Sequence, residues 1–280
     1  MSRTLPDLAP IHALAVEMAE LAGAQITASL GRALAVRYKA LGADPAAEFR
    51  DPVSEIDQNV ETLLRTRLAD RFPDHGVIGE ESAPTGGSGA DFTWIIDPVD
   101  GTANFVNGYP LFAASIGVAF EGRPVIGAVW CSASHALRPG VYHAVEGGAL
   151  HFEAQPIAAV DRSGVRRRIV GLPRVPVGLD VGFEARQSGS AALECAFVAA
   201  GLLAGARFEA PNLWDVAGGI PLLAASNLSV LTRLSNATAE WENFAGFGDI
   251  WTPEEGAAIW RQPLLVGDRA AVAALGRLDL

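Results

Sequence analysis

The spacing of apolar residues predicts two helices near the start of the chain. In residues 8–30, apolar side chains recur at helical intervals, which predicts an amphipathic helix. Residues 54–72 show a second stripe of the same kind, which Pro73 ends. The segment 39–52 between them contains glycine and proline, so a loop is expected there.

The pattern changes from helical to strand-like after residue 75. Short apolar runs in residues 76–82 and 92–98 predict strands whose polar ends hold carboxylates. Residues 112–131 predict a hairpin around a turn at 121–124, and residues 140–150 predict a further strand. The middle of the chain is therefore expected to form a meandering sheet.

Strands and helices alternate in the second half of the chain. Strands are expected at 167–172, 206–210, 229–234 and 263–267, and helices at 190–201, 214–226 and 268–278. This order predicts one layered α/β domain over residues 1–280, with possible lobes at 1–155 and 156–280.

Composition and charge narrow the class of protein. Half of the residues are hydrophobic and 19% are charged, which predicts a large core and argues against disorder. With 21 Lys and Arg against 32 Asp and Glu, the net charge is −11. Such a chain repels nucleic acids and anionic membranes. The basic run at 166–168 is expected to be a solvated strand entry rather than a binding patch.

Other features indicate a soluble cytoplasmic protein. Asp7 and Glu17 interrupt the first apolar region, so no signal peptide is expected. No window offers the roughly 18 clean apolar residues that a membrane span needs. Cys131 and Cys195 lie far apart in apolar surroundings, so two buried thiols in a reducing compartment are expected.

The stretch WIIDPVDGTANF, residues 94–105, is the first candidate for chemistry. A strand that ends at Asp97 would place this carboxylate at the edge of the sheet. Pro98 turns the chain, so that Val99 can leave its carbonyl unpaired and Asp100 returns to the same side. This nest of hard oxygen atoms suits Mg²⁺.

The next two residues extend this candidate site. Gly101 and Thr102 can direct backbone N–H groups at an anion, which would place a phosphate beside the metal. The structural alternative is an Asp-Pro turn in which Asp100 caps a helix. This motif alone leaves both interpretations open.

Three further segments place carboxylates at the ends of predicted elements. Glu80 follows a short strand and is a better ligand candidate than Glu81, which can be an ordinary surface residue. Ser54 and Asp57 match a capping box, a role compatible with one in the site. Asp215 lies at a helix start, where an N-cap is the alternative role. A hydrophobic core would not bring together carboxylates from four separate segments of the chain.

Taken in order, GEES, WIIDPVDGTANF and LWDVAGG make the chain resemble the inositol monophosphatase family of magnesium-dependent, lithium-sensitive phosphatases. The resemblance extends from about residue 10 to about residue 225 and includes DPVSEIDQNVE and SGSAALECAFVAAG. It implies a layered αβαβα sandwich of the inositol monophosphatase and fructose-1,6-bisphosphatase type, and a homodimer.

The resemblance also implies a metal cage of two to three Mg²⁺ ions. Glu80, Asp97 and the Val99 carbonyl would hold the first ion. Asp97 would bridge to a second ion, which Asp100 and Asp215 complete. A third, weaker ion would depend on Glu80 and water. The metals would neutralise the phosphate and activate water, so no covalent phosphoenzyme is required.

Further roles follow from the same resemblance. Asp57 and Thr102 would orient the attacking water, which makes them catalytic candidates together with Glu80. The amides of Gly101 and Thr102 would hold the phosphate. The residues expected to bind substrate are Asp100, Gly101, Thr102, Gly189, Ser190, Ala191, Glu209 and Asp215.

The chain departs from the family pattern in several places. Glu209 lies one residue closer to the Trp-Asp pair than expected, so an edge-strand glutamate is an equal alternative to a substrate contact. The family's usual lysine is hard to place, and Lys39 is only a candidate. Residues 226–229 replace a glycine-rich turn, although Asn227 can still adopt a positive φ. The divergent segment 226–250 is expected to affect specificity rather than the metal cage.

These observations favour a Mg²⁺-dependent phosphomonoesterase acting on a small phosphorylated polyol, with inositol 1-phosphate as the leading substrate. Histidinol phosphate on the same metal cage is the main alternative. Bisphosphorylated nucleosides and fructose bisphosphate fit less well. A non-catalytic regulator of the same fold is the alternative from another class, and the complete set of carboxylates argues against it.

Overall fold

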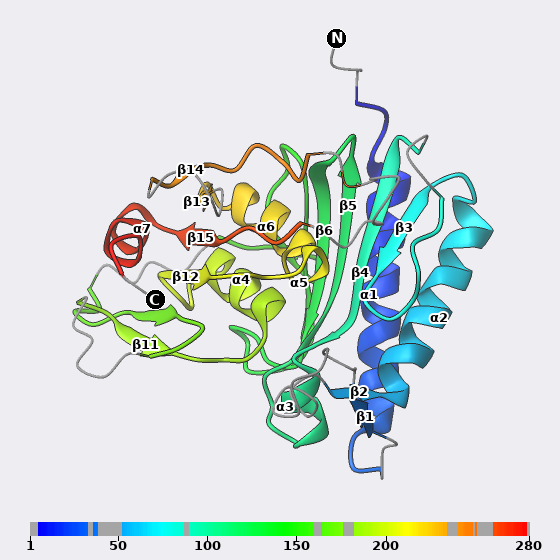
Figure 1. Ribbon diagram of the computed structural model, residues 1–280, viewed down its shortest axis with the longest axis horizontal. Helices are drawn as coiled ribbons and strands as arrows, with labels where there is room; N and C mark the ends of the chain where they lie inside the picture. The colour runs from blue at the N-terminus through cyan, green and yellow to red at the C-terminus, as the bar shows by residue number, and fades with distance from the viewer. Residues whose placement is uncertain are drawn as a thin grey trace, which may run out of the picture.

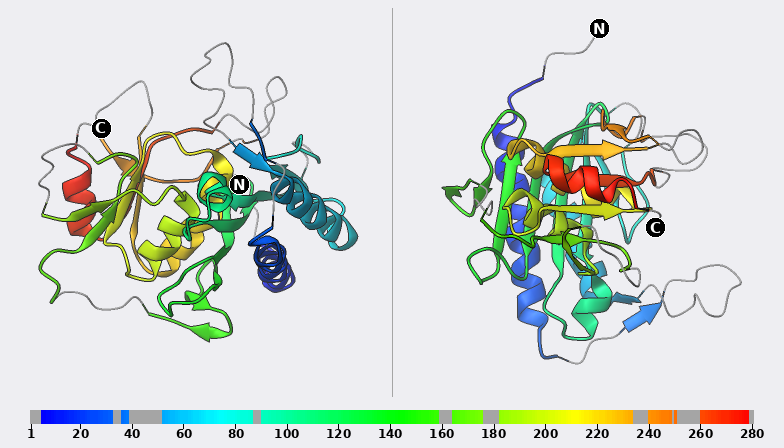
Figure 2. Two further views of the ribbon diagram at one scale, coloured as in Figure 1. Left: turned by 90° about the horizontal axis from the view of Figure 1, so that it is seen from below. Right: turned by 90° about the vertical axis from the view of Figure 1, so that its left-hand side faces the viewer.

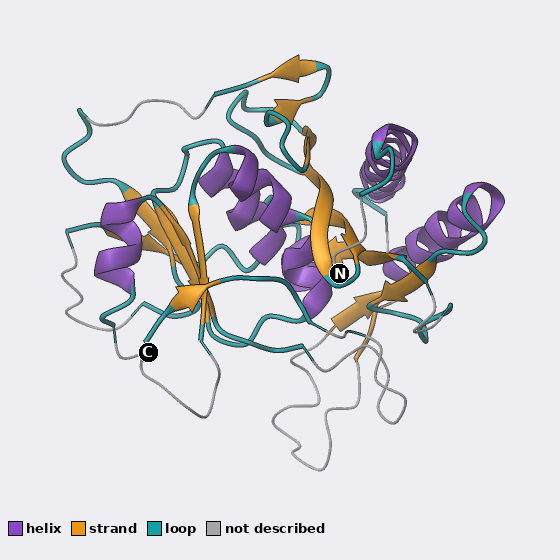
Figure 3. Cartoon of the chain, turned by 90° about the horizontal axis from the view of Figure 1, so that it is seen from above, coloured by secondary structure: helices purple, strands orange, loops and turns teal. Residues whose placement is uncertain are grey.

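The structure is a computed structural model that describes residues 5–32, 36–38, 52–86, 90–158, 164–175, 182–233, 240–248, 250 and 260–278. Its helices and sheets form five layers, in the order helices, sheet, helices, sheet and helix (Figures 1 and 3). The predicted αβαβα sandwich is therefore confirmed. The expected loop at 39–52 and Lys39 lie outside the described residues, apart from Pro52 in a short strand.

Two long helices, α1 (Ala9–Ser29) and α2 (Glu55–Arg71), form the first layer (Figure 1). Both correspond to the stripes seen in the sequence. The buried face of α1 includes Leu14 and Met18 and packs on β5, β6 and β7, whereas α2 packs on β4. Burial of this apolar face is the main source of the helices' stability in water.

The first sheet has seven strands in the described chain, in the order β3-β4-β5-β6-β7-β8-β9. Its strands are β3 (Gly76–Gly79), β4 (Phe92–Asp100), β5 (Ala113–Phe120), β6 (Arg123–Cys131), β7 (Gly140–Val145), β8 (His151–Phe152) and β9 (Gln155–Pro156). β3 and β4 are parallel, and the other neighbours are antiparallel. Helices cover both faces, which explains why its central strands are almost continuously apolar.

The strand that begins at Phe92 is longer than its sequence predicts. We expected it to end at residue 98, but it continues through Pro98 to Asp100. Its pairing with β5 shifts register between Asp97 and Asp100, as in a β-bulge. A bulge re-aims the side chains that follow it. Asp97 and Asp100 therefore lie on either side of an irregular pairing at the C-terminal end of β4.

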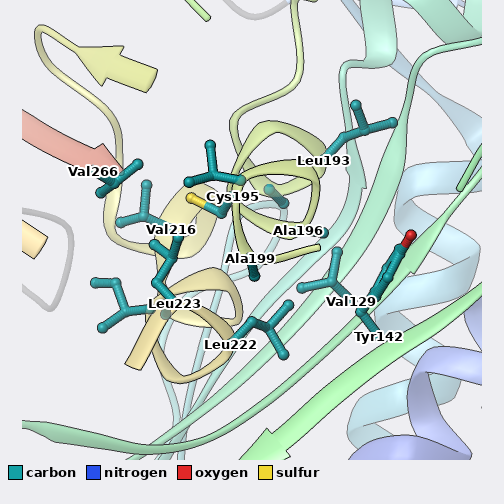
Figure 4. Packing of buried hydrophobic residues seen from close by; sticks show 14 of the residues in the cluster. Val129, Tyr142, Leu193, Cys195, Ala196, Ala199, Val216, Leu222, Leu223 and Val266 are labelled. Atoms are coloured by element: carbon teal, nitrogen blue, oxygen red, sulfur yellow. The ribbon is translucent and has the colours of Figure 1, made fainter. Parts of the chain in front are cut away.

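Three helices form the middle layer: α4 (Ala191–Ala199), α5 (Leu213–Ala217) and α6 (Gly219–Ala225). The helix expected at 214–226 is thus divided, with Gly218 between its two parts. Figure 4 shows residues of α4 and α6, such as Ala196 and Leu222, between Val129 of the first sheet and Val266 of the second. One apolar core therefore joins both sheets.

The second sheet has six strands in the described residues, in the order β11-β10-β12-β15-β13-β14. They are β10 (Ile169–Gly171), β11 (Glu184–Arg186), β12 (Gly205–Phe208), β13 (Ser229–Thr232), β14 (Glu242–Asn243) and β15 (Leu264–Gly267). Helix α7 (Arg269–Leu275) contacts β12 and β15 and forms the fifth layer (Figure 2). Asn227, which precedes β13, has a φ of 54°, as its place in the altered turn predicted.

The remaining short elements lie beside the first sheet. Strands β1 (Val36–Tyr38) and β2 (Pro52–Ser54) form an antiparallel pair, and helix α3 (Thr102–Val106) follows β4 directly. Among the described residues, none of the helices is both long and apolar enough to cross a bilayer.

Close contact between the first sheet and the middle layer depends on glycine. A Cβ added at Gly127 would lie 2.0 Å from the carbonyl oxygen of Gly218, which is backbone and cannot move aside easily. We therefore predict that Gly127→Ala lowers the free energy of unfolding by about 1–3 kcal/mol, as overpacking does elsewhere. Urea unfolding would measure it. Gly164→Ala is the control, since its Cβ would meet nothing within 4 Å. Equal midpoints for both variants would contradict this account of the packing.

Candidate active site

Two buried carboxylates lie at the C-terminal end of β4 in the first sheet. The exposed fractions of Asp97 and Asp100 are 1% and 8%. Asp97 Oδ1 accepts the N–H of Val99 at 3.0 Å, so its own turn holds this side chain. Asp100 makes a contact remote in sequence: its Oδ2 accepts the hydroxyl of Ser190 at 2.7 Å and the N–H of Ala192 at 2.6 Å. Asp100 therefore joins β4 to the N-terminus of α4.

Helix α2 begins close to this end of β4. Ser54 is the N-cap and forms a capping box with Asp57, as the sequence predicted. Asp57 is fully buried, and its Oδ2 accepts both the N–H and the hydroxyl of Ser54, at 2.9 and 2.5 Å. Its other oxygen, Oδ1, lies 2.9 Å from Thr102 Oγ1. The helix cap and the site thus share one carboxylate.

We expected the Val99 carbonyl to be unpaired, and this prediction is wrong. Thr102 Oγ1 lies 2.8 Å from the carbonyl oxygen. The reason is local. Gly101, with a φ of 89°, turns the chain into α3 and brings the first hydroxyl of that helix back over the carbonyl. Since a carbonyl oxygen has two lone pairs, Val99 can still offer one to another partner.

Asp215 reaches the site from the middle layer. It is the third residue of α5, and its Oδ2 accepts the N–H of Asn212 at 2.7 Å in a second capping box. Asn212 is therefore the N-cap, and the alternative of Asp215 as N-cap is wrong. The hydroxyl of Ser115 on β5 donates to the carbonyl of Trp214 at 3.2 Å and so connects α5 to the first sheet.

Glu80 lies directly beside Asp97. It follows β3, whose last residue pairs with Ile96 of β4, and the Glu80 N–H donates to the carbonyl of Ile96 at 3.2 Å. The predicted ligands thus lie close together at the C-terminal ends of β3 and β4: Glu80 directly after β3, Asp97 and Asp100 in β4, and Asp215 in α5.

These carboxylates raise one another's pKa. Burial has the largest effect on Asp97, and the charges of Glu80, Asp100 and Asp215 raise its pKa further, well above the usual value. Burial also raises the pKa of Asp100 to about 6 and that of Asp215 to about 7. For Asp57, burial raises the pKa against the opposing hydrogen bonds from Ser54 and Thr102. Full ionisation of the cluster at neutral pH therefore costs free energy unless a cation is added.

A cavity of about 250 Å³ opens beside the cluster. It is lined by Asp100, Leu172, Pro173, Gln187, Gly189, Ser190, Ala191, Glu194, Phe208 and Asp215. Five of the residues predicted to bind substrate therefore share one pocket. Gly101 packs just behind it, because a Cβ there would lie 3.1 Å from the carbonyl oxygen of Gly189.

Glu209 does not belong to the described lining of this cavity. Its Oε1 accepts the Nε of the buried Arg207 at 2.5 Å, and its Oε2 lies 3.6 Å from Arg233. Both guanidinium groups stack on Trp241. The edge-strand alternative is also wrong, since β12 lies between β10 and β15. A substrate contact for Glu209 stays a prediction.

Sequence reasoning missed Glu194. It is 5% exposed, lines the cavity, and accepts the hydroxyl of Ser188 at 2.6 Å. Gly171 leaves room for it, because a Cβ there would lie 2.4 Å from Glu194 Oε2. Burial raises its pKa to about 7. The available signal was a single charge within the apolar helix SAALECAFVAAG.

Comparison with known proteins agrees with this fold. The model of the inositol monophosphatase family matches residues 7–246, and the chain belongs to that family. Members of the family are phosphatases, so the chain is an enzyme that hydrolyses phosphoric monoesters.

Two relatives illustrate the similarity in sequence. The inositol-1-monophosphatase SuhB of Mycobacterium tuberculosis is 35% identical over 212 residues, which cover 67% of this chain and 70% of that protein. A fructose-1,6-bisphosphatase/inositol-1-monophosphatase of Aquifex aeolicus is 30% identical over 188 residues, covering 62% and 69%.

Solved structures share the fold. The extragenic suppressor protein SuhB of Bartonella henselae superimposes with a TM-score of 0.74 at 24% identity, covering 96% of this chain and 98% of that one. The inositol monophosphatase of Anabaena gives a TM-score of 0.69 at 23% identity, covering 97% and 96%.

The crowded carboxylates lead to a prediction about stability. An acid whose pKa is higher in the folded protein than in the unfolded chain binds more protons when folded, so stability falls as pH rises through the interval. For Asp215 this interval runs from 3.8 to about 7, and for Asp100 from 3.8 to about 6. With a chelator present, the protein should therefore lose stability as the pH rises from about 4 to about 7.

Asp97→Asn should reduce this loss and raise the melting temperature at pH 8 by roughly 3 °C, or about 1 kcal/mol. Thermal unfolding in EDTA at several pH values would measure it, with Asp70→Asn on the exposed side of α2 as the control. A lower melting temperature for Asp97→Asn at pH 8 would show that repulsion among these groups is not a significant cost.

Proposed function

We propose that this phosphatase is a Mg²⁺-dependent phosphomonoesterase that hydrolyses a small phosphorylated polyol, inositol 1-phosphate first among them, by direct attack of water. The observation that carries the proposal is the junction of buried carboxylates with a cavity. Asp100 and Asp215 belong to both, and their charges also act on Asp97. A substrate in the cavity would therefore place its phosphate beside the carboxylate cluster.

The donor set fits a hard divalent cation. Carboxylates and a peptide carbonyl are the ligands that Mg²⁺ prefers, and the raised pKa values of Asp97, Asp100 and Asp215 mark a place where added positive charge would be stabilising. Among the described side chains, no three His, Cys, Asp or Glu residues stand ready-arranged around a metal position. We propose that Glu80, Asp97, Asp100, Asp215 and the Val99 carbonyl would hold two to three ions. The bound metal would neutralise the phosphate and increase the acidity of water.

The residues of the chain would orient the attacking water. The Thr102 hydroxyl and Asp57 Oδ1 lie 2.9 Å apart, so a water that hydrogen-bonds to Thr102 is within reach of Asp57. Asp57 can take up the proton of that water, since burial raises its pKa above the ordinary value of an aspartate. This makes Asp57 and Thr102 the proposed pair that orients and deprotonates the nucleophile.

The two thiols make a covalent route a poor alternative. Cys131 and Cys195 are both fully buried, and burial raises the pKa of each well above that of a free thiol. A thiolate nucleophile needs a lowered pKa and access to the substrate. Direct attack by water is therefore the mechanism that the site supports best.

The walls of the cavity support two candidate leaving groups. Asp100, Ser190 and Asp215 offer polar contacts for the hydroxyls of a polyol. The same lining also includes the apolar Leu172 and Phe208 and the buried Glu194. It favours histidinol phosphate as the second candidate, because an imidazole and an ammonium group suit such a wall.

A panel of phosphate esters tests the proposal. We expect Mg²⁺-dependent phosphate release from inositol 1-phosphate, with histidinol phosphate as the competing substrate and a bisphosphorylated nucleoside and fructose bisphosphate as poor ones. Release of inorganic phosphate would be measured with Mg²⁺, with EDTA, and with added Li⁺. Absence of release from every ester by folded protein would overturn the proposed substrate class.

Two variants test the assignment of the cluster. Asp97→Asn and Asp215→Asn should each lower kcat at least a thousandfold, since each removes a charge that faces the reacting phosphate, while the chain stays folded. Phosphate release and circular dichroism would be measured together, with Asp70→Asn as the matched control. Near wild-type turnover in either variant would rule out its place in the metal cage.

A further inference from the structure

Glu61 is a buried charged residue that lies outside the cavity lining. Its exposed fraction is 0%, and it follows Asp57 by four residues, on the same face of α2. A buried carboxylate needs hydrogen bonds or an ion pair to offset its lost hydration. Glu61 has both, an ion pair within α2 and a hydrogen bond to the turn that contains Glu80.

The first contact of Glu61 lies directly after Glu80. Its Oε2 accepts the backbone N–H of Glu81 at 2.8 Å. The second contact lies directly before Glu80: a Cβ added at Gly79 would lie 2.5 Å from the carboxyl carbon of Glu61. The carboxyl of Glu61 therefore lies against the backbone on both sides of Glu80.

Arg65 completes this arrangement one helical turn further along. Its Nε donates to Glu61 Oε1 at 2.8 Å, so the two side chains form an ion pair within α2. Its other nitrogens donate to the carbonyl of Ser82 at 3.2 Å and to the hydroxyl of Thr85 at 3.4 Å. Glu61 and Arg65 together form hydrogen bonds to residues 81, 82 and 85, which belong to the loop that follows Glu80.

The backbone of the same turn is fixed to the sheet. Thr85 exchanges two backbone hydrogen bonds with Val77 of β3, at 2.8 and 2.9 Å, and the N–H of Glu80 bonds to Ile96 of β4. The turn is therefore closed on the sheet side and held by Glu61 and Arg65 on the helix side. The backbone of Glu80 is therefore fixed from both directions.

We propose that Glu61, paired with Arg65, is a positioning residue that sets the affinity of the site for its metal ion by fixing the backbone of Glu80. This inference rests on the proposed function in one respect, the role of Glu80 as a metal ligand. Glu61 itself touches neither the cavity nor the carboxylates of Asp97 and Asp100 in the described contacts. It acts through Gly79 and the amide of Glu81.

Helix α2 offers a matched control. Arg67 lies two residues beyond Arg65 and also pairs with a glutamate, Glu17 of α1, but contacts nothing in the turn that the structure describes. Arg65→Met and Arg67→Met each remove one positive charge and one glutamate ion pair from α2, a buried pair for Arg65 and a more exposed one for Arg67. They differ in whether the turn after Glu80 is involved.

Two measurements test the proposal. The first is titration of the metal-free protein with Mg²⁺ by calorimetry, without substrate. We expect Arg65→Met and Glu61→Met to weaken binding at least fivefold, and Arg67→Met to leave it unchanged. Glu61→Gln should recover most of the affinity lost in Glu61→Met, because its amide oxygen can still accept the N–H of Glu81. Affinities of Arg65→Met and Glu61→Met equal to that of the wild type would overturn the proposal.

The second measurement is hydrogen–deuterium exchange of residues 80–85 in the metal-free protein. Exchange there should become faster in Arg65→Met and stay as in the wild type in Arg67→Met. If Glu61→Met does not fold, Arg65→Met still tests the same turn, since it removes the bonds to Ser82 and Thr85. Unchanged exchange in Arg65→Met would also overturn the proposal. Failure of the proposed function would appear differently, as a wild type that binds no Mg²⁺ although its turn is protected.

Discussion

Mutual repulsion among buried carboxylates is the constraint on which this structure depends. Asp97 and Asp100 leave the same strand end, and Glu80 and Asp215 are brought close enough for their charges to raise the pKa of Asp97. Such a cluster costs free energy that the apolar layers must offset. Its persistence in the fold is consistent with a cation as its functional partner.

The elements around the cluster limit this cost by supplying donors at helix starts. Asp57 and Asp215 each complete a capping box, and Asp100 accepts a hydroxyl and an N–H at the first turn of α4. The unpaired N–H groups and the positive end of the helix dipole at these positions favour negative charge. These hydrogen bonds partly offset the effect of burial, which raises the pKa of Asp57, Asp100 and Asp215.

Small residues between the layers decide whether the carboxylates meet at all. Gly117 and Gly127 allow α5 and α6 to approach the first sheet at backbone distance, and Ser115 bonds to the carbonyl of Trp214. With larger side chains at these positions, α5 would stand further from the sheet and Asp215 further from Asp100. The middle layer contributes to the chemistry because it packs so closely.

The sequence by itself determined the fold class, most of the helices and strands, and the segments that hold the carboxylates. Apolar periodicity and turn residues act over a few positions, so local patterns report them directly, and the family resemblance supplied the expected roles. Tertiary structure decided which groups meet. Asp100 bonds to Ser190 ninety positions away, Glu209 pairs with Arg207 and Arg233, and Glu61 lies behind Glu80. These pairings depend on the register of β4 and on how closely the layers pack, and neither is encoded within a single segment.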